Sequence, residues 1–220
     1  MKKGKPMFIA VFLVMIVVLS AITFFYWYNS YHFMITENAY VDGTITKVSP
    51  QVPGEYLEIV VAEGDQVQAG QIVARQSDRT LAPGTDSDLA VVRAPITGTV
   101  IKRLAQPGEV GAPGQPAVWL CDLSRVYVTV NLEETQLARV RSGQRAELRV
   151  DGLPGETFAG RVLSVGEATN STFSMLPTRT TSGSFTKVVQ TVPVKIGIEQ
   201  GGNQELRLGM NTWVKVYVRE

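Results

Sequence analysis

Cysteine and histidine are almost absent from this chain of 220 residues, which contains one of each, Cys121 and His32. A single cysteine excludes an internal disulfide. One histidine with no cysteine nearby has no second ligand from which to build a metal site of the usual Cys/His type. A Ser-His-Asp arrangement needs a histidine as its base, and the only histidine is His32. These absences argue against a hydrolytic or metal-dependent enzyme.

Net charge is also scarce, because 21 basic residues nearly balance 20 acidic ones. No cluster of Lys and Arg with interleaved aromatics occurs beyond the N-terminus, so we predict no nucleic-acid partner. There is no P-loop, and any ATP would be hydrolysed by another subunit. Glu133 and Glu134 are adjacent carboxylates that could be taken for an acid/base pair. The simpler interpretation is that they lie at the start of a short helix, where negative charge is favourable. The sequence therefore predicts no catalytic, cofactor or metal site.

Cys121 lies in the apolar run 117–123, where a small buried hydrophobe is expected. The competing interpretation is a reactive thiol, which needs an exposed and electropositive setting. His32 follows a group of aromatic residues and is interpreted as an interfacial polar residue.

One long apolar run is present near the N-terminus. Met7 to Tyr28 are 22 residues without a charged side chain, enough for a helix of about 33 Å that crosses a hydrocarbon core of about 30 Å. The run ends in aromatic residues typical of a membrane interface, whereas a cleaved signal peptide, the alternative, is shorter and ends in a small-x-small site. Lys2, Lys3 and Lys5 precede it and predict a cytoplasmic N-terminus, with the chain after Tyr28 outside the cytoplasm.

An internal repeat organises the chain after the anchor. The segment 48–76 recurs at 92–120 with a constant offset of 44 positions. The matched glycines, expected to form the structural turns of each copy, are Gly54, Gly64 and Gly70 in the first and Gly98, Gly108 and Gly114 in the second. Two copies indicate a pseudo-twofold unit and not a solenoid. Short β-branched runs between the glycines predict two interlocked halves of a flattened β-sandwich.

QVPGEYLEIVVAEGDQVQAGQIVARQ and VRAPITGTVIKRLAQPGEVGAPGQP resemble the two halves of a biotinyl/lipoyl-type domain. Carrier members of that superfamily present a lysine in the turn between the halves, but the connection here, SDRTLAPGTDS at 77–87, contains none. With TENAYVDGTITKVSPQVPGEY, AVVRAPITGTV and GSFTKVVQTVPVKI, the chain resembles bacterial membrane fusion proteins, or periplasmic adaptor subunits, of the hemolysin-secretion type, and is most similar to multidrug-exporter adaptors. The resemblance covers about residues 36 to 220.

The chain departs from that family at 77–87, because typical members carry a long helical hairpin there. No heptad run elsewhere replaces the hairpin. The departure argues against contact with an outer-membrane channel and favours a shortened adaptor from a cell with one membrane.

After Cys121 about six strands are expected to close into a small barrel, which agrees with the resembled family. They are expected at 126–132, 146–150, 158–165, 187–198, 206–208 and 212–218, with a short helix at 133–140. Eight of the 15 residues at 170–184 are Ser or Thr, which predicts a loop, and Phe173, Met175 and Leu176 either cap the barrel or contact a partner.

The predicted fold class is mainly β, with an N-terminal transmembrane helix, a lipoyl-like sandwich and a small β-barrel. The predicted order is a cytoplasmic tail (1–6), an anchor (7–28), a linker and first strand leading into the barrel (29–43), a lipoyl-like domain in two halves (44–76 and 88–122) joined by 77–87, and a β-barrel (123–220).

The resemblance implies an inner-membrane, single-pass adaptor of an export system that forms homo-oligomers and docks on a major-facilitator or ABC transporter without catalysis. The alternative is an envelope interaction or assembly protein that uses the same β-domains as a binding module.

Overall fold

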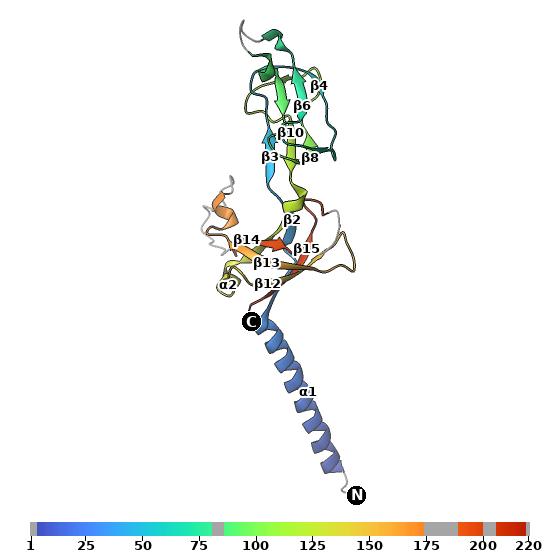
Figure 1. The fold of residues 1–220 in the computed structure, drawn as a ribbon. Coiled ribbons are helices and arrows are strands. Elements are labelled where there is room, and N and C mark those ends of the chain that lie inside the picture. Colours follow the sequence, from blue (N-terminus) through green and yellow to red (C-terminus); the bar gives the residue numbers. More distant parts are fainter. Residues whose placement is uncertain (1–3, 81–85, 174–188, 200–205, 219–220) are drawn as a thin grey trace, which may run out of the picture. The chain divides into compact units, whose positions relative to one another are not determined.

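A computed structural model describes residues 4–80, 86–173, 189–199 and 206–218. Contacts divide the chain into two units. One comprises 1–40, 128–203 and 210–220 and contains the apolar helix and most of the barrel strands, and the other comprises 41–127 and 204–209 and contains the sandwich. The chain is mainly β with one long N-terminal helix and a barrel-like sheet (Figure 1), as the sequence predicts.

Helix α1 runs from Gly4 to His32, four residues beyond the predicted end of the apolar run. Its segment Val11–Asn29 is long and apolar enough to cross a membrane. The aromatic group continues one turn further as stacked neighbours, with ring centroids 5.5 Å apart for Trp27 and Tyr31 and 4.1 Å apart for Tyr28 and His32. His32 is therefore the last residue of α1 and a member of the aromatic group.

Eight strands in two four-stranded sheets build the sandwich, in the orders β3-β10-β8-β5 and β7-β6-β4-β9. The strands are β3 (Ile45–Val48), β4 (Gly54–Ile59), β5 (Gln66–Val67), β6 (Ile72–Gln76), β7 (Val91–Arg93), β8 (Gly98–Arg103), β9 (Val110–Gly111) and β10 (Val118–Cys121). The sequence pattern did not predict β5 and β9, because strands of two residues are too short to show an alternation of apolar and polar residues.

The two sheets are images of each other under the 44-residue repeat. Adding 44 to β4 and β5 gives the bounds of β8 and β9, and the shift carries β3 onto β7 and β6 onto β10 within two residues. Each half therefore contributes strands to both sheets, which is the interlocked arrangement that the repeat predicts. Even the bulges correspond, since the pairing shifts register between Tyr56 and Glu58 in one sheet and opposite Val100 and Lys102 in the other.

The core of the sandwich consists mainly of valine and alanine side chains, together with Leu120 and one aromatic residue, Tyr56, at 3% exposure. Val73, Val118 and Leu120 are completely buried. Burial of each such aliphatic side chain contributes about 1.5 to 3 kcal/mol relative to exposure. Tyr56 occupies the position that Val100 occupies in the second half, so the two halves pack their cores differently.

A seven-stranded sheet of order β1-β15-β12-β13-β14-β11-β2 makes the barrel, which lies mostly in the unit that contains α1. The strands are β1 (Phe33–Thr36), β2 (Ala39–Asp42), β11 (Tyr127–Glu133), β12 (Arg145–Val150), β13 (Phe158–Val165), β14 (Thr191–Ile198) and β15 (Thr212–Tyr217). β1 and β2 are consecutive in the chain but lie at opposite ends of this order. A bridge between Tyr40 of β2 and Asn211, the residue before β15, connects β2 to the opposite side of the sheet, so the sheet closes on itself.

Several barrel predictions need correction. The described part of 123–220 contributes five strands and not six, because Leu206–Leu208 is not a strand and its chain turns at Leu208 and Gly209, where φ is +84°. Helix α2 is limited to Glu134–Leu137, shorter than the predicted 133–140. No side chain caps its N-terminus, and Val140 is buried in the following turn.

Candidate interaction surfaces

Four of the repeat glycines adopt a left-handed backbone in matched turns. Gly64, Gly70, Gly108 and Gly114 have φ of +94°, +85°, +88° and +87°, which other residues adopt only with strain. The Gly64 amide donates to Val100 O at 2.8 Å, and the Gly108 amide donates to Tyr56 O at the same distance. The turns at Gly64 and Gly108 thus each bind a strand of the other half of the repeat, which is a scaffold role.

Gly54 and Gly98 do not lie in turns. They are the first residues of β4 and β8. Gly54 lies close to the backbone carbonyl of Ser77, and Gly98 lies close to that of Cys121. A Cβ atom at Gly98 would lie 2.7 Å from Cys121 O, and one at Gly54 would lie 3.2 Å from the equivalent Ser77 O. Close backbone approach, rather than turn geometry, explains the glycine at these two positions.

The connection between the halves is short and its ends lie side by side. β6 and β7 pair antiparallel, with Ala74 opposite Val92 and Arg75 opposite Val91. Between them the structure describes two short 3-10 helices, Asp78–Thr80 and Ser87–Ala90, and Asp86 caps the second by accepting the Asp88 amide at 2.9 Å. The paired strands therefore bring the two ends of the connection 77–87 close together.

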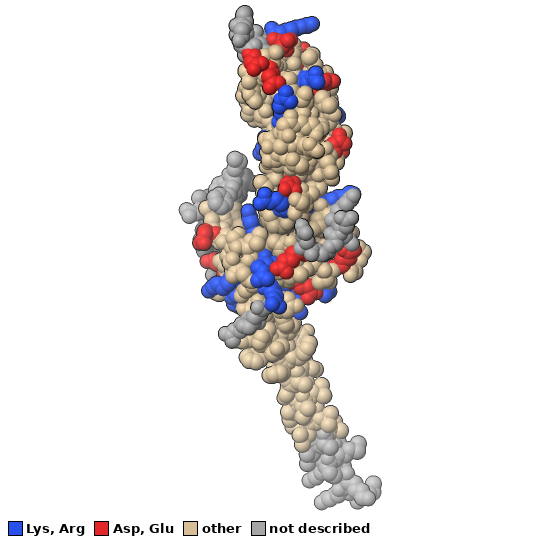
Figure 2. All heavy atoms as spheres, in the orientation of Figure 1, with Lys and Arg blue, Asp and Glu red and all other residues tan. Residues whose placement is uncertain are grey.

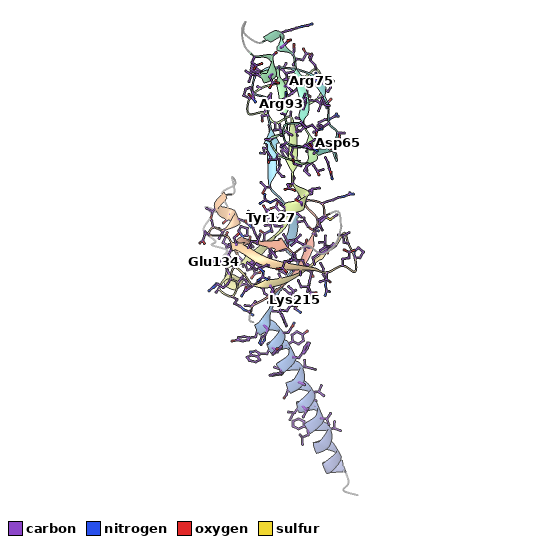
Figure 3. The ribbon with its side chains drawn as sticks, viewed as in Figure 1. Asp65, Arg75, Arg93, Tyr127, Glu134 and Lys215 are labelled. Carbon is purple, nitrogen blue, oxygen red and sulfur yellow. The ribbon has the colours of Figure 1, made fainter. Side chains whose placement is uncertain are left out.

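The acidic and polar candidates do not assemble into a reaction centre. Glu133 and Glu134 are exposed. Glu134 is the first residue of α2 (Figure 3), and its amide donates to Gln190 O at 3.0 Å. His32 stacks on Tyr28 at the end of α1. Within the ranges that the structure describes, no group of three His, Cys, Asp or Glu residues is arranged to hold a metal ion.

Cys121 is fully buried beside the backbone of Gly43, where a Cβ would lie 2.8 Å from its Sγ. Burial raises the pKa of the Cys121 thiol, and the charges of Asp122 and Asp42 raise it further. A neutral, buried thiol is a poor nucleophile. This environment matches the interpretation of Cys121 as a small core residue.

We expect native Cys121 to resist alkylation. At pH 8 iodoacetamide should modify the folded full-length chain roughly a hundredfold more slowly than the urea-unfolded chain, the factor given by an opening free energy of about 3 kcal/mol. The reaction is followed by intact mass, and because Cys121 is the sole cysteine every adduct reports on it. A native rate equal to the unfolded rate would show that the thiol is accessible.

Exposed apolar side chains mark candidate docking faces on each unit. On the sandwich, Leu57 is 61% exposed and Val110 is 71% exposed, on the paired strands β4 and β9. On the barrel, Ile35 and Leu163 are 46% and 55% exposed. The predicted contact residue Phe173 ends a 3-10 helix, Asn170–Phe173, where a loop was expected. Met175 and Leu176 lie outside the described residues.

A junction between α1 and the barrel was not predicted from the sequence. Arg139 Nη2 donates to Tyr31 O at 2.8 Å, and the Val218 amide donates to His32 O at 3.0 Å. Both bonds satisfy carbonyl groups of the last helical turn, which have no partner within the helix. No local pattern marks an arginine 108 positions away as the partner of a helix end, so only the fold reveals this contact.

The chain combines an apolar helix, a pseudo-twofold lipoyl-like sandwich and a small closed barrel. Its candidate sites are structural turns and exposed apolar faces. This combination is that of an adaptor-type scaffold. The family model of the YknX-like beta-barrel domain matches residues 126–216. YhbJ of Bacillus subtilis, named as an efflux system component, is 33% identical over 189 residues, which span 86% of this chain and 81% of that protein. The multidrug export protein EmrA of Escherichia coli is 34% identical over 126 residues, 56% of this chain but 32% of EmrA.

The membrane fusion protein Spr0693 of Streptococcus pneumoniae shares the fold, with a TM-score of 0.59 at 15% identity over 84% of this chain and 97% of that one. The chain belongs to the membrane fusion protein, or periplasmic adaptor, family of efflux components. It spans most of the Bacillus relative and about a third of EmrA.

Proposed function

We propose that this protein is a single-pass, membrane-anchored adaptor subunit that forms homo-oligomers and docks on an inner-membrane exporter of small molecules. The observation that carries the proposal is the identity to an efflux component over most of both chains. The N-terminal apolar helix supports anchoring, with residues 1–6 in the cytoplasm and the β-domains outside. Binding and assembly, rather than catalysis, would be its mechanism.

The domain division that we propose follows the predicted boundaries, with 44–76 and 88–122 as the two halves of the sandwich and 123–220, with a loop at 170–184, as the barrel. The linker at 29–43 supplies β1 and β2, which support its assignment to the barrel. The barrel would take the docking role next to the transporter, because its β1 begins directly after α1.

The reach of this adaptor follows from the connection between the halves. β6 and β7 pair up to Arg75 and Val91, and the intervening residues 77–87 are too few for a helical hairpin of two long antiparallel helices. We therefore propose that the subunit does not contact an outer-membrane channel. A partner transporter of the major-facilitator type is what the resemblance to multidrug-exporter adaptors implies, and an ABC exporter is the other transporter class that the experiment must discriminate.

The docking proposal is tested by photo-crosslinking in membranes. A photoreactive amino acid replaces Ile35 or Leu163 on the barrel, and the matched control replaces Glu156, which is half-buried in the segment before β13. We expect the barrel positions to crosslink to a polytopic transporter encoded nearby, and deletion of either gene to produce the same sensitivity to lipophilic drugs.

Crosslinks to a peptidoglycan-associated or sensor protein, with no change in drug sensitivity, would contradict export and support the envelope-assembly alternative. The short connection is the observation that favours that alternative, since an adaptor without a hairpin is limited to partners near the membrane.

A further inference from the structure

The two outer faces of the sandwich share a backbone but carry different side chains. The core lies between the sheets, so one outer face belongs to β7-β6-β4-β9, the other belongs to β3-β10-β8-β5, and the two point away from each other. The 44-residue repeat carries one sheet onto the other. A difference in charge between equivalent positions therefore comes from the side chains and not from the fold, and it can be followed position by position.

The outer surface of β4 and β9 carries a carboxylate beside two exposed apolar side chains. Glu55 and Leu57 alternate with the buried Gly54 and Tyr56, so they point outward. Val110, on β9, is the direct cross-strand partner of Glu55, and both apolar side chains are largely exposed. Glu55 takes part in none of the salt bridges among the described residues. We call Glu55, Leu57 and Val110 the acidic-apolar face.

The opposite surface carries two lysines on either side of a tryptophan. Lys47 on β3, Trp119 on β10 and Lys102 on β8 are cross-strand partners in one row. Both lysines are exposed, Trp119 is half-buried, and Lys47 Nζ lies 5.6 Å from the centroid of the Trp119 ring. Neither lysine belongs to a salt bridge in the described ranges. We call these three residues the lysine face.

The repeat shows that each face has a chemistry which its counterpart lacks. The row equivalent to the lysine face consists of Val91, Arg75 and Glu58, and it has no net charge because Arg75 pairs with Glu58 at 3.1 Å. The three positions equivalent to the acidic-apolar face are uncharged, namely Thr99, Ile101 and Gln66. One side of the sandwich therefore presents an unpaired negative charge with apolar surface, and the other presents unpaired positive charges with an aromatic ring.

We propose that the acidic-apolar face of one copy of this chain docks on the lysine face of a second copy. The carboxylate of Glu55 meets the lysine ammonium groups, and the two apolar side chains cover Trp119, a residue type enriched in interface cores. Figure 2 shows the charged side chains of the sandwich separated by uncharged surface, as a mixed polar and apolar contact requires. The inference rests on the proposed homo-oligomer and names its contact.

The contact is heterologous, because it joins one face to a different face. The two faces lie on opposite sides of the sandwich, so a copy that binds one neighbour still presents a face to the next. A twofold dimer would instead place each face against itself and bring like charges together, which opposes association. The charge distribution thus favours repeated addition of copies over a closed pair.

Cysteine crosslinking of the full-length chain in membranes tests the arrangement. One tagged variant carries Val110→Cys, a differently tagged variant carries Ile101→Cys beside the lysine face, and a short bismaleimide joins neighbouring thiols. We expect crosslinks between the two tags when the variants are coexpressed, and a ladder beyond the dimer when one chain carries both changes. The matched control replaces Ile101→Cys by Gln115→Cys, in an exposed turn outside both faces, and should give no ladder.

Exchange of charges tests the chemistry of the contact. Glu55→Lys alone and Lys102→Glu alone should each raise the dissociation constant about tenfold, or about 1.4 kcal/mol, because an attraction becomes a repulsion. The double variant should restore association, since opposite charges meet again. Arg79→Glu makes the same charge change outside both sheets and should have no effect. Sedimentation velocity in detergent measures association, and all three residues are exposed, so folding is retained.

Several results would overturn the proposal. Crosslinking of the Val110→Cys variant to itself would indicate a twofold contact, and a double charge variant as weak as the single ones would show that these charges do not meet. Crosslinks from Ile101→Cys to another protein, with none to this chain, would assign the lysine face to a different partner.

Failure of the proposed function gives a different pattern. If the ladder forms but no barrel position crosslinks to a transporter, the contact between copies stands and the export proposal fails. If the barrel crosslinks to a transporter while the chain stays monomeric, docking on the transporter stands and the contact between copies fails.

Discussion

Replacing Gly111 by valine is expected to destabilise the sandwich by about 3 kcal/mol, near the upper end of the usual overpacking cost. Even a single Cβ at Gly111 would lie 2.5 Å from Cε2 and Cζ of Tyr56. Tyr56 is 3% exposed, and burial together with the charge of Glu109 raises the pKa of its hydroxyl. Because the ring is enclosed by the core, it cannot move aside for a new side chain.

The 44-residue repeat supplies a compensating substitution. Under the 44-residue shift Tyr56 corresponds to Val100, and Val67 corresponds to Gly111. The neighbouring residues Tyr56 and Gly111 therefore correspond to Val100 and Val67, so that one large side chain beside a glycine takes the place of two valines. Tyr56→Val alone should leave a cavity and cost about 2 to 4 kcal/mol. The double variant copies the other half and should be more stable than Gly111→Val, with a coupling energy of about 2 kcal/mol.

Urea unfolding of the full-length chain in detergent measures this cycle. Trp119 on β10 reports on the sandwich once Trp27 and Trp213 are replaced by phenylalanine. Strict additivity of the two single changes would contradict the proposed sharing of volume.

The second large effect is a difference between equivalent glycines. Gly98→Ala should cost about 2 to 3 kcal/mol, because its Cβ would lie 2.7 Å from Cys121 O and 3.0 Å from Cys121 C, and strand backbone cannot shift without breaking the β8–β10 pairing. Gly54→Ala meets Ser77 O at 3.2 Å and should cost about 1 kcal/mol or less.

Gly54→Ala is a matched control, because both substitutions remove the same backbone freedom from the unfolded chain and that contribution cancels in the comparison. The same Trp119 fluorescence assay measures both. Equal destabilisation by the two alanines would show that the half-ångström difference in backbone approach has no energetic consequence.

The repeat explains why the sandwich was predictable. Its strands and turns are set by local signals that occur twice, namely β-branched runs and glycines such as Gly64 and Gly108 at positive φ. The role of Gly54 and Gly98 was not predictable, since their packing partners, Ser77 and Cys121, lie 23 residues further along the chain. A glycine in the sequence looks the same whether a turn or a neighbouring carbonyl requires it.

In the barrel the sequence predicted some strands but not the closure of the sheet. β13 was predicted at Phe158–Val165 as the strand that returns after a turn, and the structure has the same bounds, while the predicted strand at 206–208 is an irregular segment that leads into a turn. Alternation over three residues cannot distinguish a strand from an irregular segment. The closure of the sheet through β1, β2 and the Tyr40–Asn211 bridge depends on contacts between residues far apart in the chain.

The sequence by itself determined the apolar helix, the doubled lipoyl-like unit, the short lysine-free connection and the resemblance to adaptors, because each is written in local composition or in the fixed offset between two copies. Only the tertiary structure decided which sheet each strand joins, how Tyr56 and Gly111 share space, and that Arg139 and Val218 bind carbonyl groups at the end of α1. These features arise from pairing and packing across long sequence separations, which no local pattern records.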